Sequence, residues 1–298
     1  MATIGDFISI KKNDAYQNLI FGARYPSYIN WSGFFIPDFP ADGLCLETDF
    51  QNDIRDYTLA RLETEPAVSK LFSLSAAELI GDRVSVAESV IDTGIFNTYS
   101  SVDQFLTILV QLRNKYEKDI SFNYALALNT DNVGNLSSDA VNRIESLIQS
   151  DFFSSLTLYG DFNQQLSRVS FFLKLAKFYE MPINLHLLQN LQGQEKLPNL
   201  IDLLEPKKII GTAEQLAKAM PLFKSKPVKA VVIPGYVKLE PQKNAENLRV
   251  LLDSGIKVQL CTDNLLFYNC SLSEFAFYLC NTTLFTKQEL VSLLTASI

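Results

Sequence analysis

The feature of this sequence that most limits its fold is a regular alternation of short apolar runs with amphipathic helical segments. The alternation begins near residue 100 and continues through the last third of the 298 residues. Alternating strands and helices are typical of a parallel sheet covered by helices. We expect strands at residues 120–128, 152–159, 183–187, 208–211, 228–234 and 256–261.

The helical segments between these runs are recognisable from their starts as well as from their periodicity. Four starts place Ser or Thr three residues before Glu or Gln, the spacing of a capping box: Ser101 and Gln104, Thr212 and Gln215, Ser271 and Glu274, Thr286 and Glu289. Further helices are expected at residues 138–149, 166–176, 197–204 and 244–253. Each connects two of the expected strands, as a parallel sheet requires.

The first hundred residues are less regular. We expect an amino-terminal arm at 1–24 with a short helix at 14–21, a first strand at 25–32, helices at 52–63 and 67–79, and a second strand at 95–99. This gives eight strands in one chain of 298 residues, the size of a single (β/α)8 TIM barrel domain. A doubly wound open sheet is the alternative, but no Gly-x-Gly-x-x-Gly follows any early strand.

Composition limits the compartment and the partners. The net charge of −7 argues against nucleic acid as a partner, and no apolar run reaches the length of a membrane span. The amino terminus lacks the pattern of a signal peptide, so we expect a cytoplasmic protein. The four cysteines, Cys45, Cys261, Cys270 and Cys280, do not have the spacing of a zinc site. A small-molecule ligand is possible, and the sequence identifies no protein partner.

Polar and small residues follow the expected strands, and in a barrel these strand ends form one mouth. Ligands and chemistry collect at this carboxyl face. The candidate mouth residues are Asn30 and Ser32, Gly160 and Asp161, His186 and Gln189, Gly211 and Thr212, Pro234 to Tyr236, and Asp263 and Asn264. His186 is the single histidine of the chain.

Several of these strand ends resemble the adenosine deaminase branch of the metal-dependent hydrolase (amidohydrolase) superfamily. The motifs are NLHLLQ, KKIIGTAE, VVIPGYV and the run NAENLRVLLDSGIKVQLCTDNLLFYNCSLSEFAFYL, followed by SLLTASI. The resemblance covers roughly residues 100–298 and implies a barrel of the metal-dependent hydrolase type. It also implies a zinc site held by a His-x-His pair, a His after strand five and an Asp after strand eight.

By position, the resemblance assigns His186 and Asp263 to two of these zinc ligands. The His-x-His pair would correspond to Asn30-Trp31-Ser32. The family's proton-donating Glu is replaced by Gln189, its strand-six His by Thr212, and its second Asp by Asn264. A catalytic zinc normally needs three protein ligands, and Gln189 and Thr212 cannot handle protons as a carboxyl group or an imidazole does. We therefore expect no bound metal and no cofactor.

Three hypotheses follow for the function. The preferred one is a degenerate adenosine deaminase-like barrel, a pseudoenzyme that binds a small polar or purine-like ligand at its mouth. Its predicted ligand-binding residues are Asn30, Ser32, His186, Gln189, Thr212, Asp263 and Asn264. The second is an active hydrolase or deaminase with a rebuilt site, in which His186 and Asp263 are catalytic. The third is a scaffold for protein–protein interaction.

Overall fold

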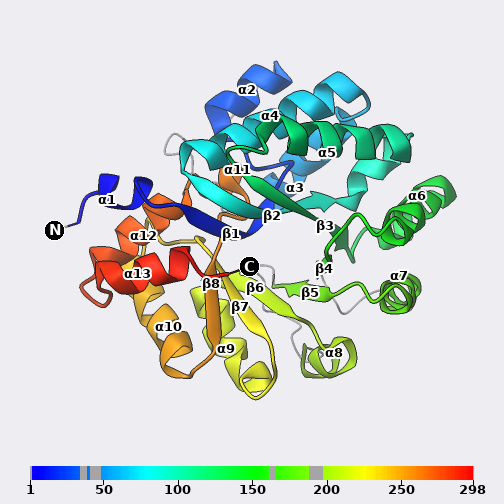
Figure 1. Cartoon of the computed structure of the whole chain (residues 1–298). Coiled ribbons are helices and arrows are strands. Elements are labelled where there is room, and N and C mark those ends of the chain that lie inside the picture. The colour runs from blue at the N-terminus through cyan, green and yellow to red at the C-terminus, as the bar shows by residue number, and fades with distance from the viewer. Residues whose placement is uncertain (1, 34–38, 41–47, 161–165, 188–196, 298) are drawn as a thin grey trace.

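In a computed structural model the chain forms a barrel of eight parallel strands, each hydrogen-bonded to the next in sequence order (Figure 1). The structure describes residues 2–33, 39–40, 48–160, 166–187 and 197–297. The strands are β1 (Lys12–Asn18), β2 (Val84–Asp92), β3 (Ser121–Asn129), β4 (Leu156–Tyr159), β5 (Ile183–His186), β6 (Lys208–Thr212), β7 (Lys229–Ile233) and β8 (Lys257–Leu260). The expected TIM barrel is thereby confirmed.

The barrel closes where the chain just after β8 meets β1. The backbone N–H of Asp263 donates to the Tyr16 carbonyl at 3.0 Å, and the N–H of Asn18 donates to the Asp263 carbonyl at 3.0 Å. This parallel bridge, centred on Gln17 and Asp263, joins the first and last strands. Asp263 is therefore part of the barrel wall as well as of the mouth.

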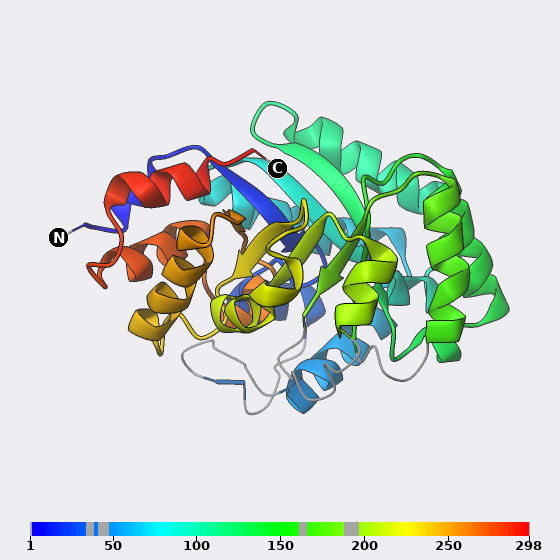
Figure 2. The same ribbon diagram turned by 90° about the horizontal axis from the view of Figure 1, so that it is seen from below.

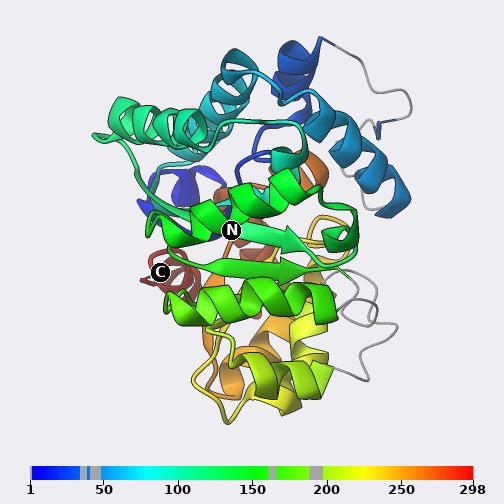
Figure 3. The same ribbon diagram turned by 90° about the vertical axis from the view of Figure 1, so that its right-hand side faces the viewer.

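Helices surround the barrel on its outside, and Figures 2 and 3 show them from two further sides. They are α1 (Gly5–Ile8), α2 (Tyr25–Ser32), α3 (Thr48–Ala60), α4 (Glu65–Gly81), α5 (Val102–Tyr116), α6 (Ser138–Gln149), α7 (Leu166–Phe178), α8 (Leu197–Leu204), α9 (Ala213–Phe223), α10 (Pro241–Asp253), α11 (Leu265–Tyr268), α12 (Leu272–Cys280) and α13 (Lys287–Leu294), with 3-10 turns η1 (Thr93–Asn97) and η2 (Val133–Asn135). Among the described residues, no helix combines the length and apolar character of a membrane span.

From β3 onward the predicted strands and helices are confirmed, with boundaries that differ by a few residues. Three of the four predicted capping boxes are complete: those opened by Thr212, Ser271 and Thr286. At the fourth helix start, Ser101 accepts a hydrogen bond from the backbone of Gln104.

The predictions for the first two strands are wrong. Residues 25–32 form helix α2, in which Pro26 lies in the first turn, where a missing N–H is tolerated. The first strand lies within the expected arm, at Lys12–Asn18, where a helix was predicted. The expected second strand at 95–99 falls on η1 and the turn after it, and the second strand, Val84–Asp92, precedes it.

The barrel interior contains charged groups as well as apolar side chains. Lys208 on β6 reaches across to Glu88 on β2, with Nζ 2.8 Å from Oε2, and also donates to the Ala15 carbonyl at 3.3 Å. Asp14 on β1 is buried and accepts hydrogen bonds from the Thr262 hydroxyl at 2.5 Å and the Thr262 N–H at 3.2 Å. The contacts of Lys208 join β6 to β2 and β1, which are not its neighbours in the barrel. The contacts of Asp14 join β1 to the chain after β8, which the closing bridge brings together.

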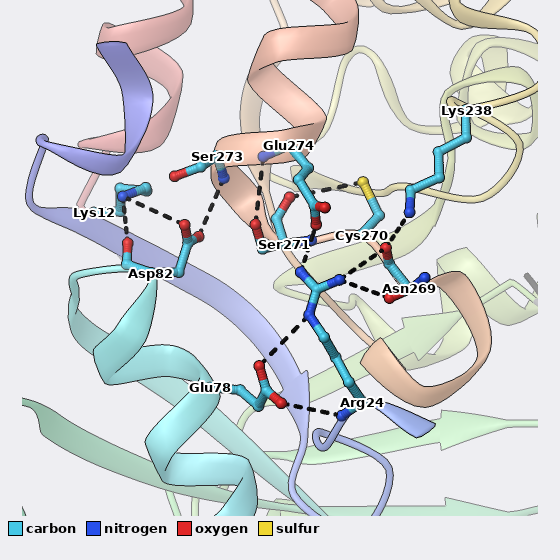
Figure 4. Close-up of polar contacts among 10 residues, drawn as sticks. All are labelled: Lys12, Arg24, Glu78, Asp82, Lys238, Asn269, Cys270, Ser271, Ser273 and Glu274. Atoms are coloured by element: carbon cyan, nitrogen blue, oxygen red, sulfur yellow. Dashed lines mark hydrogen bonds and ion pairs between the residues drawn. The ribbon is translucent and has the colours of Figure 1, made fainter. Parts of the chain in front are cut away.

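A second polar cluster, drawn in Figure 4, fixes the chain between β1 and α2 against the outer helices. The Arg24 guanidinium donates to Asn269 Oδ1 and Glu274 Oε2, both at 2.6 Å, and lies 3.5 Å from Glu78 Oε2. Lys238 donates to the Asn269 carbonyl. Arg24 thus ties α4, α12 and the turn after α11 to the amino-terminal end of α2.

Candidate functional site

The mouth of the barrel contains a small cavity of about 150 Å³ at the carboxyl ends of the strands. Polar side chains from five strands and from α3 face it, together with a few aromatic rings. They are Tyr16, Asn18, Phe21, Gln51, Asn52, Arg55, Asp92, Asn129, Asp131, Tyr159, His186, Asp263, Asn264 and Phe267. Parallel strands bring these residues together because their carboxyl ends all meet at one face.

His186 and Asp263 are in contact on the cavity floor. Nε2 of His186 lies 3.3 Å from Oδ2 of Asp263, and both side chains are buried. The Tyr16 ring lies 5.4 Å from the His186 ring, between centroids. The other polar atoms of the pair, His186 Nδ1 and Asp263 Oδ1, have no partner among the described residues. The pair therefore keeps one free donor or acceptor position on each member.

Asp263 also has an unusual backbone. Its φ of 51° lies in the left-handed region, which Asn and Asp tolerate better than other residues with a Cβ. The next residue, Asn264, caps the short helix α11, and its buried Oδ1 has no partner among the described residues. The turn after β8 thus presents two side chains with unused hydrogen-bonding capacity.

Arg55 brings a positive charge from α3 into the same cavity. Its Nε donates to Asp92 Oδ2 at 2.8 Å, and its Nη2 donates to the Tyr159 hydroxyl. Burial opposes the charged form of Arg55, but the Asp92 carboxylate outweighs it, and the pKa of Arg55 is raised. Burial also raises the pKa of Tyr159 well above its ordinary value. Arg55 is thus a permanent cation that neutralises Asp92.

Tyr16 and Asn18, at the end of β1, line the cavity beside His186 and Asp263, whereas Asn30-Trp31-Ser32, to which the resemblance assigned the His-x-His pair, lies on α2. Burial, followed by the nearby Asp263 carboxylate, raises the pKa of Tyr16 well above its ordinary value, so the phenol stays protonated. The Asn18 oxygen already accepts the backbone N–H groups of Ile20 and Phe21, at 3.0 and 3.3 Å.

These donors do not fit a zinc ion. Within the described residues, no group of three His, Cys, Asp or Glu side chains is placed to hold a metal. A catalytic zinc site normally has three protein ligands and an open position. His186 and Asp263 supply two, and neither neighbour on β1 is an available third.

The structure brings three of the predicted site residues together: His186, Asp263 and Asn264. Asn30 and Ser32 lie on α2, because residues 25–32 are helical, and neither lines the cavity. Thr212 does not line it either. Its hydroxyl accepts the Gln215 N–H at 3.2 Å as the cap of α9. Gln189 lies outside the described residues.

Sequence reasoning missed much of the cavity wall. The sequence pattern predicts a helix where β1 lies and a second strand at 95–99, so it does not identify Tyr16, Asn18 or Asp92. Arg55 is on a helix that was predicted, but nothing in its local pattern shows that it turns toward the mouth. Two polar residues spaced i, i+2 after an extended run, as in Tyr16 and Asn18, are the signal that was available.

Comparisons with known proteins agree with this architecture. No family model matches the chain. A curated protein of Treponema pallidum (strain Nichols), described as a putative adenosine/adenine deaminase, is 26% identical over 99% of both chains. The fold is similar to a zinc-bound amidohydrolase from Burkholderia ambifaria, with a TM-score of 0.76 at 15% identity over 99% of this chain and 87% of that one.

Two further solved structures have the same fold. An N6-methyl-AMP deaminase from Arabidopsis thaliana gives a TM-score of 0.69 at 14% identity, covering 98% of this chain and 92% of that one. An adenine deaminase from Arthrobacter aurescens gives 0.65 at 14% identity, covering 95% and 96%. The curated relative confirms the predicted resemblance to adenosine deaminases, and these structures show that the chain shares its fold with them.

Proposed function

We propose that this protein, whose barrel resembles those of deaminases of the amidohydrolase superfamily, binds a small, polar, purine-like molecule at the barrel mouth. The binding involves no metal ion, and the molecule is not deaminated. The observation that carries the proposal is a formed cavity whose floor has buried polar atoms without a partner among the described residues. His186 Nδ1, Asp263 Oδ1 and Asn264 Oδ1 all belong to it.

The free energy of these unpaired atoms is the reason to expect a ligand. A buried donor or acceptor without a partner destabilises a fold by about 1–3 kcal/mol. A flat heterocycle with donors and acceptors at its edge supplies partners for such atoms, and Phe21, Phe267 and Tyr16 offer ring faces against which it can pack. At about 150 Å³ the cavity is smaller than most drug-sized sites, which favours a base-sized ligand.

A second candidate is an active deaminase with a rebuilt site. The relative described as a putative adenosine/adenine deaminase favours it, because the two chains align over nearly their whole length. Here His186 would be the general base that activates water, and Asp263 would hold the imidazole in position at 3.3 Å. No zinc takes part in this version, because the donor set does not fit one.

Metal content and ammonia release test the proposal together. We expect the purified protein to contain far less than one zinc per chain by elemental analysis, because the described residues offer only His186 and Asp263 as donors. We also expect no ammonia release from adenine or adenosine, while hypoxanthine, adenine or adenosine raises the melting temperature. Stoichiometric zinc that is lost in His186→Ala would contradict the metal-free site. Ammonia release that is abolished by Asp263→Ala would favour the second candidate.

Asp263→Asn is expected to raise stability while weakening binding. The substitution removes a buried carboxylate with one unpaired oxygen and keeps a residue type that suits the left-handed backbone. We expect a gain of about 1–3 kcal/mol in the free energy of unfolding, because an amide is less costly to bury than a carboxylate, and weaker stabilisation by purines. Asp131→Asn is the control, because Asp131 lines the same cavity but is exposed. A clear fall in melting temperature for Asp263→Asn would make Asp263 a structural residue.

A further inference from the structure

A second and larger cavity, of about 620 Å³, lies at the opposite end of the barrel from the mouth. It is formed around the amino-terminal ends of β3, β4 and β5 and the carboxyl-terminal ends of α6 and α7, which flank these strands in Figure 3. Its lining residues include Arg113, Tyr124, Phe152, Tyr179 and Glu180. Its volume is within the range of about 300–1,000 Å³ usual for small-molecule sites.

Arg113 is the unusual residue of this cavity. Its guanidinium lies over two aromatic rings, 5.2 Å from the Tyr124 centroid and 4.9 Å from the Phe152 centroid. Its Nε is buried and has no acceptor among the described residues. The Tyr124 and Phe152 rings are themselves stacked, with centroids 5.6 Å apart. The rings hold the cation in place, but they give its buried N–H no hydrogen-bond partner.

Other half-buried arginines of the described chain have acceptors. Arg24 and Arg55 donate to carboxylates, and Arg143 donates to the Phe96 carbonyl at 2.7 Å. The best comparison is Arg249, which also lies over a ring, 4.3 Å from the Phe285 centroid, yet donates to Glu289 at 2.9 Å. Among the described residues Arg113 pairs with no carboxylate, although the chain has a net charge of −7. A carboxylate ligand in the cavity would supply the counter-ion that Arg113 lacks there.

The rim of the same cavity has the opposite charge. Asp151 and Glu180 line it and are exposed. Each lies just past the end of a helix, α6 or α7, where the helix dipole already favours a cation. An acidic residue there increases the negative potential. The rim is therefore suited to an ammonium group, and the inner wall to a carboxylate.

We propose that this cavity binds a small aromatic zwitterion of the chemical class of a free aromatic α-amino acid. The ring packs against Phe152 and the exposed Tyr179, the carboxylate accepts hydrogen bonds from Arg113, and the ammonium group faces Asp151 and Glu180. The site is separate from the barrel mouth and does not depend on the function proposed there.

Titration calorimetry with three probes tests this assignment on the full chain. We expect L-phenylalanine to bind, 3-phenylpropionate, which lacks the ammonium group, to bind more weakly, and phenethylamine, which lacks the carboxylate, to bind weakest. Absence of L-phenylalanine binding at millimolar concentration would overturn the proposal. So would binding of phenethylamine as tight as that of L-phenylalanine, because the carboxylate would then have no role.

Variants locate the binding. Arg113→Gln is expected to weaken L-phenylalanine binding by about tenfold or more, the effect of losing a charge-assisted hydrogen bond. Arg249→Gln, which removes a similar arginine–ring contact elsewhere, and Asp263→Asn in the mouth should leave it unchanged. Asp151→Asn with Glu180→Gln should weaken L-phenylalanine but not 3-phenylpropionate, and this exposed pair serves if Arg113→Gln does not fold. Unchanged binding in either cavity variant would overturn the assignment.

Discussion

Lys208→Met is expected to destabilise the protein by about 3–5 kcal/mol near neutral pH, the effect of leaving the other member of a buried ion pair without its partner. Glu88 would remain buried inside the barrel without the ammonium group that pairs with it. Its Oε1 already has no partner among the described residues. Chemical denaturation of the variant and of the unaltered protein measures the difference in the free energy of unfolding.

The double variant Lys208→Met with Glu88→Leu shows how much of the loss of stability comes from the unpaired charge and how much from altered packing. Replacing a buried pair by apolar residues of similar volume is often neutral or stabilising, so we expect most of the stability to return. Lys218→Met is the matched control, because Lys218 pairs with Glu214 at the same 2.8 Å but on the surface. Its effect should stay below about 1 kcal/mol. If Lys208→Met lowers the free energy of unfolding no more than Lys218→Met does, water must reach Glu88.

The same buried charges explain which parts of the fold could be predicted from sequence. From β3 onward the strands are apolar runs between capped helices, and local pattern is sufficient. β1 (Lys12–Asn18) contains Lys12, Asp14, Gln17 and Asn18, which are polar and yet buried. Their partners lie far away in sequence, as Asp82 does for Lys12 and Thr262 for Asp14. A polar strand whose partners are distant has no local signature.

The candidate site divides in the same way. Strand ends five and eight could be read from the sequence, and in the structure His186 and Asp263 line the cavity at the mouth. Tyr16 and Asn18 could not be placed while the first strand was assigned to residues 25–32. Arg55 enters the mouth from a helix, and only the tertiary structure brings it to Asp92. The sequence pattern is therefore sufficient to locate the strand ends, whereas the full set of side chains around the cavity can be identified only from the three-dimensional structure.

Asp14→Asn is expected to stabilise the protein above neutral pH and to remove part of its pH dependence. Burial raises the pKa of Asp14 from its ordinary value of 3.8 to about 7, despite the hydrogen bonds from Thr262. The folded protein therefore holds a proton on Asp14 that the unfolded chain has released. Stability falls as the pH rises from about 4 to about 7, and above this range the difference amounts to about 4 kcal/mol. Asparagine cannot ionise, so the stability of the Asp14→Asn variant does not fall in this way as the pH rises.

Unfolding free energies measured from pH 4 to pH 8 test this, because the gap between variant and unaltered protein must widen across that window. Asp6→Asn, followed from pH 2 to pH 8, is the control with the opposite sign. Hydrogen bonds from Lys287 and Thr3 lower the pKa of Asp6 to about 2, so its stabilisation stays constant above its ordinary pKa of 3.8 and is lost only as the pH falls toward about 2. If Asp14→Asn is instead less stable than the unaltered protein at pH 8, Asp14 is an ionised carboxylate that Thr262 stabilises, and its three hydrogen bonds from Thr262 and Tyr16 outweigh its burial.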